Sequence, residues 1–409
     1  MARDSGGYYI IKIFPGLASV ILSIVFVRTQ GVSSYGAFAV AVAAASVASL
    51  IGSGWMRSSV LRFSGTRGPS GVVPVVARAL TYVGTGVACS AVCGTLLSLD
   101  VPTALSAGVV GSVSAWMTIR QTVLMVRLDV KGQVWRELSR GISTVALPLI
   151  ALWLWPEMVF LSLLALAFSC WPYLWIPEHE GEISVDYSVL TDSRKWIAWL
   201  KYGIPWSLAV GIGALLSFSD RFAIQVVLGP EAAGQYSSVV DTLGKVAGFV
   251  LFPLVQACVP RLMRNVHAGD ERGARDVWRL TLRVVCGLGT VLALLLALIG
   301  PLLVHALLGI VVDRGVCFLI ALISVAWPVV YVMQLRLEVT RRTSLTALLY
   351  LIVTACVVYL ETLLASQFGL MGASGALVMG LGVIACACWL FTLKMEWSDS
   401  DRLPRRSRQ

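Results

Sequence analysis

The sequence predicts an all-α polytopic membrane protein of about twelve transmembrane helices, and three observations support that class. The mean hydropathy is +0.82 and only 13% of the residues are charged, whereas soluble domains carry about 25%. Apolar runs follow one another along the 409 residues, and a helix needs roughly 20 such residues to cross a bilayer. The third observation is an internal repeat whose offset is close to half of the chain.

The repeat is clearest in two segments that each join two long apolar runs, VRTQGVSSYGAF from Val27 and DRFAIQVVLGPEAAGQY from Asp220. Each contains a glycine, four residues, a second glycine, one residue and an aromatic ring: Gly31, Gly36 and Phe38, then Gly229, Gly234 and Tyr236. The flanks match as well, with a lysine before a proline upstream (Lys12 and Pro15; Lys201 and Pro205) and a basic cluster downstream (MRSSVLRF; VPRLMR). We interpret this order as a duplicated unit whose second copy begins near residue 200.

Apolar length places six spans in each half. The predicted spans are 10–27, 36–56, 79–99, 104–125, 141–155 and 158–176, then 202–219, 232–256, 284–308, 316–333, 345–365 and 371–393. Because six spans separate the copies, both enter the membrane from the same side, and the repeat is parallel. The chain therefore divides into an N-terminal half (1–176), a linker (177–201), a C-terminal half (202–393) and a tail (394–409).

The distribution of positive charge predicts the topology. Of the 32 Lys and Arg residues, 26 fall in the N-terminal segment, the tail and every second connection, and three (Arg28, Arg221, Arg314) fall in the opposite loops. Cytoplasmic segments carry the excess of positive charge in membrane proteins. Both termini are therefore predicted to be cytoplasmic, which requires an even number of spans. The remaining three cations, Lys12, Arg120 and Lys245, fall inside predicted spans.

Several function classes lack support. The net charge of +10 lies in short segments between apolar runs, which indicates membrane orientation and no nucleic-acid partner. Nearly all of the nine cysteines lie in apolar runs, as packing residues and not as a disulfide framework. Lys12 interrupts the first apolar run and no small-residue cleavage site follows, so we expect no removed signal peptide. The three histidines are scattered and no phosphate-binding glycine loop precedes a helix, so we predict no catalytic residues and no cofactor.

The linker contains PEHEGEISVD, followed by an amphipathic stretch, SRKWIAWLK. Its acidic residues and His179 could be considered metal ligands, but no other histidine is placed to complete a site, so a solvated linker is favoured and no metal is predicted. The basic tail from Trp397 is predicted to be disordered.

Charges inside the membrane are the candidate functional residues, because each costs roughly 2.5 to 3.5 kcal/mol at a span centre. Lys12 shares a small, polar helical stripe with Gly16, Ser19 and Ser23. Arg120 lies about 10 Å deeper than Arg127 along its helix. Each of the two cations either snorkels to the cytoplasmic interface or faces a hydrated cavity. Pro15, next to Lys12, and Pro205 are expected to bend the first span of each half.

The eighth span carries the strongest signal. Asp241 and Lys245 stand at positions i and i+4, on a stripe with Ser237 and Gly248, and form either a structural ion pair or the wall of a water-filled cavity. On the seventh span, Asp220 either lines the same cavity or marks the outer interface together with Arg221. Glu361 on the eleventh span is expected at the outer interface.

At these residues the chain resembles a known family. The motifs that carry the resemblance are an early proline, R-x-x-G-x4-G-x-aromatic, Y-G-I-P (Tyr202 to Pro205), D-R (Asp220, Arg221), L-G-P-E-A-A-G-Q-Y and P-R-L-M-R. They are similar to those of the polysaccharide transporter, or O-antigen flippase, family, which belongs to the multidrug/oligosaccharidyl-lipid/polysaccharide exporter superfamily. The resemblance implies two six-helix lobes around a V-shaped cavity, alternating access, and an undecaprenyl-diphosphate-linked oligosaccharide that crosses the bacterial inner membrane for surface polysaccharide assembly. It also implies a coupling ion, H⁺ or Na⁺, and a polysaccharide polymerase as partner.

Three hypotheses remain from the sequence. A lipid-linked glycan flippase leads, because the cavity cations Lys12, Arg120 and Lys245 suit a diphosphate, with Asp220 and Asp241 left for ion coupling. A drug or cation antiporter of the same superfamily is the alternative, although it would want a predominantly acidic cavity. A membrane-embedded glycosyl- or acyltransferase is third, and the lack of a carboxylate or histidine cluster counts against it.

Overall fold

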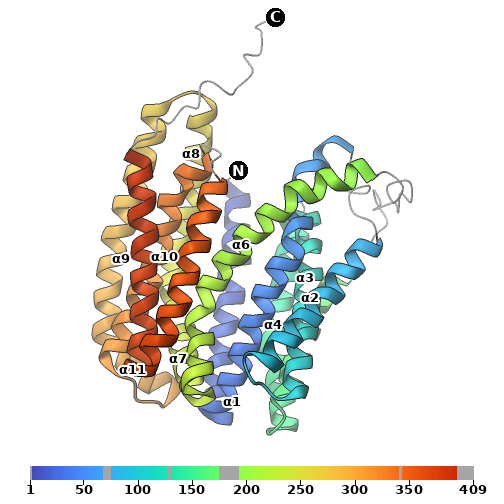
Figure 1. Cartoon of the computed structure of the whole chain (residues 1–409), viewed down its shortest axis with the longest axis vertical. Helices are drawn as coiled ribbons and strands as arrows, with labels where there is room; N and C mark the ends of the chain where they lie inside the picture. Colours follow the sequence, from blue (N-terminus) through green and yellow to red (C-terminus); the bar gives the residue numbers. More distant parts are fainter. Residues whose placement is uncertain (1, 68–74, 127–129, 175–192, 340–342, 394–409) are drawn as a thin grey trace, which may run out of the picture.

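The structure is a computed structural model that describes residues 2–67, 75–126, 130–174, 193–339 and 343–393, and these residues form helices without strands (Figure 1). The first half contains α1 (Ala2–Arg67), α2 (Val75–Thr95), α3 (Val101–Val126), α4 (Val130–Leu154), α5 (Val159–Phe168) and the 3₁₀ turn η2 (Trp171–Tyr173). The second half contains α6 (Ser193–Leu228), α7 (Pro230–Val239), the π-helical turn η4 (Val240–Gly244), α8 (Lys245–His267), α9 (Glu271–Leu308), α10 (Arg314–Val339) and α11 (Thr343–Leu393).

These elements supply the twelve predicted spans, although two helices contain two spans each. In α1 the chain turns at Gly31 (φ 82°, ψ 173°), and in α11 it turns at Gly369 (φ 59°, ψ −139°). A positive φ is accessible to glycine at little cost, so one residue is enough to turn the chain where a longer loop was expected. The eighth span is continuous from α7 through η4 into α8.

The two halves form two lobes of six spans. Figure 1 shows α2, α3 and α4, in lighter blue to cyan, and α8 to α11, in yellow to red, diverging toward the end of the molecule where α1 begins and α11 ends. α1 and α6 pack against each other between the lobes, and α1 also contacts α7 and α8 of the second half. The start of α1 and the end of α11 lie at the same end of the described part of the chain, as a topology with an even number of spans requires.

The sixth span is the main departure from the predicted boundaries, because α5 ends at Phe168 and the chain continues as the short turn η2. Pro172 explains the end: a proline in a continued helix would clash with the carbonyl of the residue four positions earlier, which is Phe168. α5 is therefore about 15 Å long, half of the hydrocarbon thickness.

Candidate functional site

The two halves meet at a reciprocal contact between the second glycines of the repeat. A Cβ atom on Gly36 would lie 2.0 Å from the carbonyl oxygen of Pro230, and one on Gly234 would lie 1.9 Å from that of Val32. Val32 and Pro230 have the same offset of 198 residues as the two glycines. Such mutual contacts are what a two-fold axis produces, and the repeat therefore has its axis at this contact.

Gly31 and Gly229, the first glycines of the repeat, adopt the same backbone conformation. Their dihedrals are φ 82°, ψ 173° and φ 89°, ψ 179°. Each precedes the helix that contributes the close contact, so the equivalent sequence positions produce equivalent corners. The sequence repeat is therefore a structural repeat as well.

Beside this contact lies a buried charge cluster that we call the Asp241 cluster: Asp241, Arg221, Lys245, Tyr35 and Ser19. The guanidinium of Arg221 donates to both carboxylate oxygens of Asp241, at 2.9 Å and 3.2 Å. The Nζ atom of Lys245 lies 3.2 Å from Asp241 Oδ1. Asp241 therefore contacts two cations, and a fork-shaped guanidinium is the partner that fits a carboxylate best.

The Asp241 cluster also joins the two halves of the chain. The hydroxyl of Tyr35 donates to Asp241 Oδ2 at 2.7 Å, and Lys245 donates to the hydroxyl of Ser19. Tyr35 follows the corner at Gly31, whereas Ser19 precedes it. Both arms of α1 are thereby bonded to the same short stretch of the second half.

The π-helical turn η4 contains or adjoins the two residues that the eighth span contributes to the cluster. Asp241 lies inside the turn, and Lys245 is the first residue of α8 beyond it. Single π turns inside α-helices are rare and occur frequently at functional sites. Asp241 therefore lies at the one place in the eighth span where the backbone departs from α geometry.

A second group of buried polar residues, which we call the carboxylate pair, contains Asp220 of α6 and Glu361 of α11. Asp220 accepts a hydrogen bond from the hydroxyl of Tyr236 and one from the backbone N–H of Arg221 at 2.8 Å. Ser219, the neighbour of Asp220, donates to Glu361 Oε1 at 3.0 Å. The other oxygen, Glu361 Oε2, is buried and has no hydrogen-bond partner among the described residues.

The burial of these carboxylates differs from the sequence expectation. Glu361 is 0% exposed and Asp220 is 3% exposed, so the interfacial placement expected for Glu361 is wrong. Arg221 was counted among the outer-loop cations, yet it is buried inside α6 by its bonds to Asp241. A hydropathy pattern shows the length of a span but not which of its faces meets a partner helix, and the partner explains both departures.

The first half contains a polar cluster that the sequence analysis did not single out. Glu137 of α4 accepts bonds from Arg140 at 2.7 Å and 3.0 Å, and from Gln121 of α3 and Tyr173 of η2. Glu137 is 2% exposed. The one sequence signal for this cluster was the spacing of Glu137 and Arg140, at i and i+3 near the start of a span. The same spacing is common on solvated helices, so it did not indicate a buried cluster.

Of the three predicted diphosphate ligands, the structure describes the side chains of Arg120 and Lys245, and these two have different partners. The side chain of Lys12 lies outside the described residues. Arg120 lies with its guanidinium carbon 5.6 Å from the ring centre of Trp116 on its own helix, whereas Lys245 is part of the Asp241 cluster. The predicted pairing of Asp241 with Lys245 is present, with Arg221 as an additional partner.

The structure also describes the residues predicted to bend helices and those predicted to couple transport to an ion. Pro15 and Pro205 lie inside α1 and α6, and the bends there stay a prediction. Asp220 belongs to the carboxylate pair and Asp241 to the Asp241 cluster, and Arg221 bonds to both, through its backbone N–H to Asp220 and through its guanidinium to Asp241.

Comparison with known proteins shows a shared fold at low sequence identity. No protein-family model matches the chain, and no curated protein matches it. An inward-facing conformation of a multidrug resistance MATE family transporter of the MOP superfamily has a TM-score of 0.69 at 13% identity, over 93% of each chain. An outward-facing conformation of a MATE family transporter has a TM-score of 0.62 at 14% identity, over 95% of this chain and 93% of that chain. A eukaryotic MATE transporter has a TM-score of 0.61 at 13% identity, over 97% of each chain.

The fold and the buried charges together define a class. This chain is an all-α polytopic membrane protein of twelve spans in two pseudo-symmetric six-helix lobes, and it has the fold of MATE transporters of the MOP superfamily.

Proposed function

We propose that the chain is a cation-coupled, alternating-access transporter that translocates a lipid-linked oligosaccharide with a diphosphate group, such as an undecaprenyl-diphosphate-linked glycan. The observation that supports the substrate class is the charge at the junction of the halves. Of the three charged residues in the Asp241 cluster, Lys245 is the most exposed, with 28% of its side chain accessible, against 12% for Asp241 and 8% for Arg221. A substrate that reaches the junction therefore meets a cation first, and a diphosphate offers it several acceptor oxygens.

Alternating access is supported by the position of the inter-lobe contacts. The glycine contact closes the lobes against each other at the end away from the start of α1 and the end of α11, and the lobes diverge toward those helix ends. The charge distribution predicts that the termini are cytoplasmic, so this arrangement corresponds to an inward-open state. The solved MATE structures carry both inward-facing and outward-facing names, and the fold therefore accommodates both states in related proteins.

The carboxylate pair supports cation coupling. Two ionised carboxylates in one buried site repel each other, and a proton or a monovalent cation relieves that cost. The electrostatic proximity of Asp220 and Glu361, together with the unpartnered oxygen of Glu361, makes this pair the candidate binding site for H⁺ or Na⁺. Intramembrane ionisable groups of this kind mark proton and ion pathways in transporters.

A multidrug antiporter is the second candidate, and the names of the structurally similar proteins favour it. A cationic drug would need an accessible carboxylate. Asp220 and Glu361 are buried and Asp241 is neutralised by two cations, so the described conformation offers such a drug little negative charge.

Transport in proteoliposomes separates the two candidates. The full chain is reconstituted with a polyprenyl-diphosphate-linked oligosaccharide, whose transfer is followed by a membrane-impermeant glycosidase, or with a fluorescent organic cation. We expect transfer of the glycolipid, a loss of about tenfold or more in Lys245→Gln, and none in the matched control Arg314→Gln, an exposed arginine at the start of α10. Export of the organic cation without glycolipid transfer would support the antiporter instead.

A further inference from the structure

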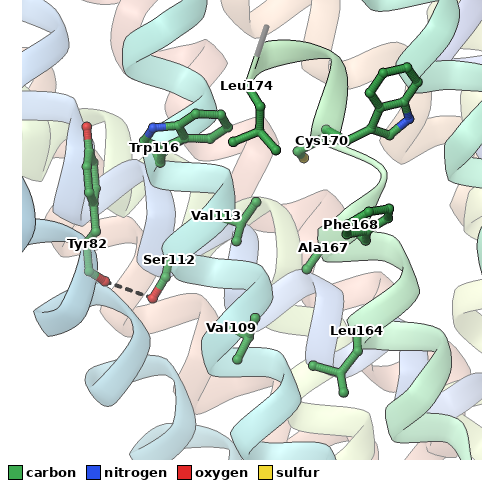
Figure 2. A pocket seen from close by; sticks show the side chains of 11 residues that line it. Tyr82, Val109, Ser112, Val113, Trp116, Leu164, Ala167, Phe168, Cys170 and Leu174 are labelled. Atoms are coloured by element: carbon green, nitrogen blue, oxygen red, sulfur yellow. Dashed lines mark hydrogen bonds between the residues drawn. The ribbon is translucent and has the colours of Figure 1, made fainter.

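A lipid-facing groove lies on the first lobe, away from the Asp241 cluster and the carboxylate pair. It has a volume of about 440 Å³ and lies between α3 and α5, with Tyr82 of α2 on its far side (Figure 2). Its lining residues are Tyr82, Val109, Ser112, Val113, Trp116, Leu164, Ala167, Phe168, Cys170, Trp171 and Leu174. The volume is within the range of about 300–1,000 Å³ for pockets that enclose small ligands.

The early end of α5 creates this groove. The helix stops at Phe168, so Trp171 and Leu174, which also line the groove, belong to the turn that follows and not to a continued α5. Figure 2 shows Val109, Val113 and Trp116 along α3 opposite Leu164, Ala167 and Phe168 of α5. Among the polar groups that line the groove, the hydroxyl of Ser112 donates a hydrogen bond to the carbonyl oxygen of Tyr82 at 2.8 Å.

The surroundings of the groove are apolar at membrane depth. Phe168 is 64% exposed and Leu174 is 61% exposed, and Leu80, Val83 and Val87 of α2 are also exposed. α3 packs against both α2 and α5, all three helices contact α1, and α3 and α5 also contact α4. Exposed apolar side chains on a membrane-spanning helix face the acyl chains, so a hydrocarbon chain of the bilayer can enter the groove directly.

One end of the groove is positively charged. Arg120 lies one turn beyond Trp116 on α3, and Arg78 lies one turn before Tyr82 on α2. Arg120 stacks on the Trp116 ring, and both guanidinium groups lie within electrostatic range of Tyr82. This is the end at which α2 begins and α3 ends, the side that the positive charges of the sequence predict to be cytoplasmic. Basic pockets between transmembrane helices on that side bind anionic lipid headgroups.

We propose that this groove binds one acyl chain of an anionic glycerophospholipid from the cytoplasmic leaflet, with Arg78 and Arg120 holding its phosphate. The charge at one end and the apolar lining along the rest match the two ends of such a lipid. None of the groove's lining residues belongs to the Asp241 cluster or the carboxylate pair.

Native mass spectrometry of the full chain in detergent tests this proposal. Dioleoylphosphatidylglycerol and zwitterionic dioleoylphosphatidylcholine are titrated separately, and we expect the first to bind about tenfold or more tightly. The double variant Arg78→Gln/Arg120→Gln should lose this preference, whereas Arg275→Gln/Arg279→Gln, an exposed pair on α9, should keep it. Val109→Trp should lower the binding of phosphatidylglycerol by filling the groove. Leu105→Trp, one turn away on the same helix and more exposed, should not.

Three results would overturn the assignment. Equal binding of the two lipids by the unchanged protein would remove the headgroup argument. Unchanged binding by a monodisperse Val109→Trp protein would place the lipid elsewhere. Tighter binding of undecaprenyl phosphate than of phosphatidylglycerol, competing at the same site, would assign the groove to a polyprenyl chain and not to a bilayer phospholipid.

Discussion

The hydroxyl of Tyr35 lies 2.7 Å from Oδ2 of Asp241, 206 positions further along the chain. This bond connects the helix after the first glycine corner with the π-helical turn after the second. Because Arg221 and Lys245 share the same carboxylate, Asp241 holds together three helical segments and both halves.

Asp241→Asn should destabilise the protein more than any other single change in this cluster. It leaves Arg221 buried without its anion, and removal of one partner from a buried ion pair typically costs about 3–5 kcal/mol. Tyr35→Phe removes a single bond to a charged acceptor and should cost about 1.5–3 kcal/mol. Thermal unfolding in detergent measures both.

Tyr350→Phe is the matched control, because Tyr350 donates to the neutral amide of Gln334 at 2.6 Å. We expect it to have the smallest effect of the three, about 0.5–1.5 kcal/mol. If Asp241→Asn unfolded no earlier than Tyr35→Phe, the central role of this carboxylate would be wrong.

Gly36→Ala should weaken the closed contact between the lobes. The added methyl group would overlap the carbonyl oxygen of Pro230, which is backbone and cannot rotate away. In an alternating-access protein this favours the state in which the contact is open. We expect Ser34→Cys, placed beside the contact in an otherwise cysteine-free chain, to react several-fold faster with a membrane-impermeant thiol reagent.

Gly287→Ala serves as the control, because a Cβ atom at Gly287 would meet no atom within 4 Å. That variant should leave the labelling rate of Ser34→Cys unchanged. Equal rates in the Gly36→Ala and Gly287→Ala backgrounds would show that the reciprocal glycine contact does not hold the lobes closed.

The sequence predicted the fold because its signals are local or periodic. Apolar length defines a span, and the repeated glycines mark corners whose φ values other residues avoid, so Gly31 and Gly229 could be paired without a structure. Prediction of the site, in contrast, required knowledge of which helices face each other, and this is not a local property of the sequence. Arg221 was placed in a loop because its partner is on another span. The contact of Arg120 with Trp116 was not predicted, and a cavity shared by Arg120 and Lys245 stays a prediction. Charges in apolar runs show that partners are needed but do not identify them.

The charge distribution leads to a topology prediction. Single cysteines at Pro156 and Ser366 should react with a membrane-impermeant reagent from outside, because both lie at the ends of spans opposite the termini. A cysteine at Gly269 or Gly68 should react only after the membrane is opened. External labelling at Gly269, which follows the basic end of α8, would contradict cytoplasmic termini.

Glu361→Gln should separate ion coupling from folding. The amide has nearly the shape of the carboxyl group and can still accept the hydrogen bond of Ser219, so the variant should reach the membrane at normal levels. It cannot change its charge, and the repulsion toward Asp220 that a bound cation relieves is absent. In proteoliposomes we expect substrate transfer that no longer responds to an imposed H⁺ or Na⁺ gradient, while the unchanged protein responds to one of them.

Thr362→Val is a suitable control, because the Thr362 hydroxyl is exposed at the neighbouring position and bonds only to its own helix in the described contacts. A Glu361→Gln protein that still responds fully to the gradient would remove the carboxylate pair from the coupling mechanism.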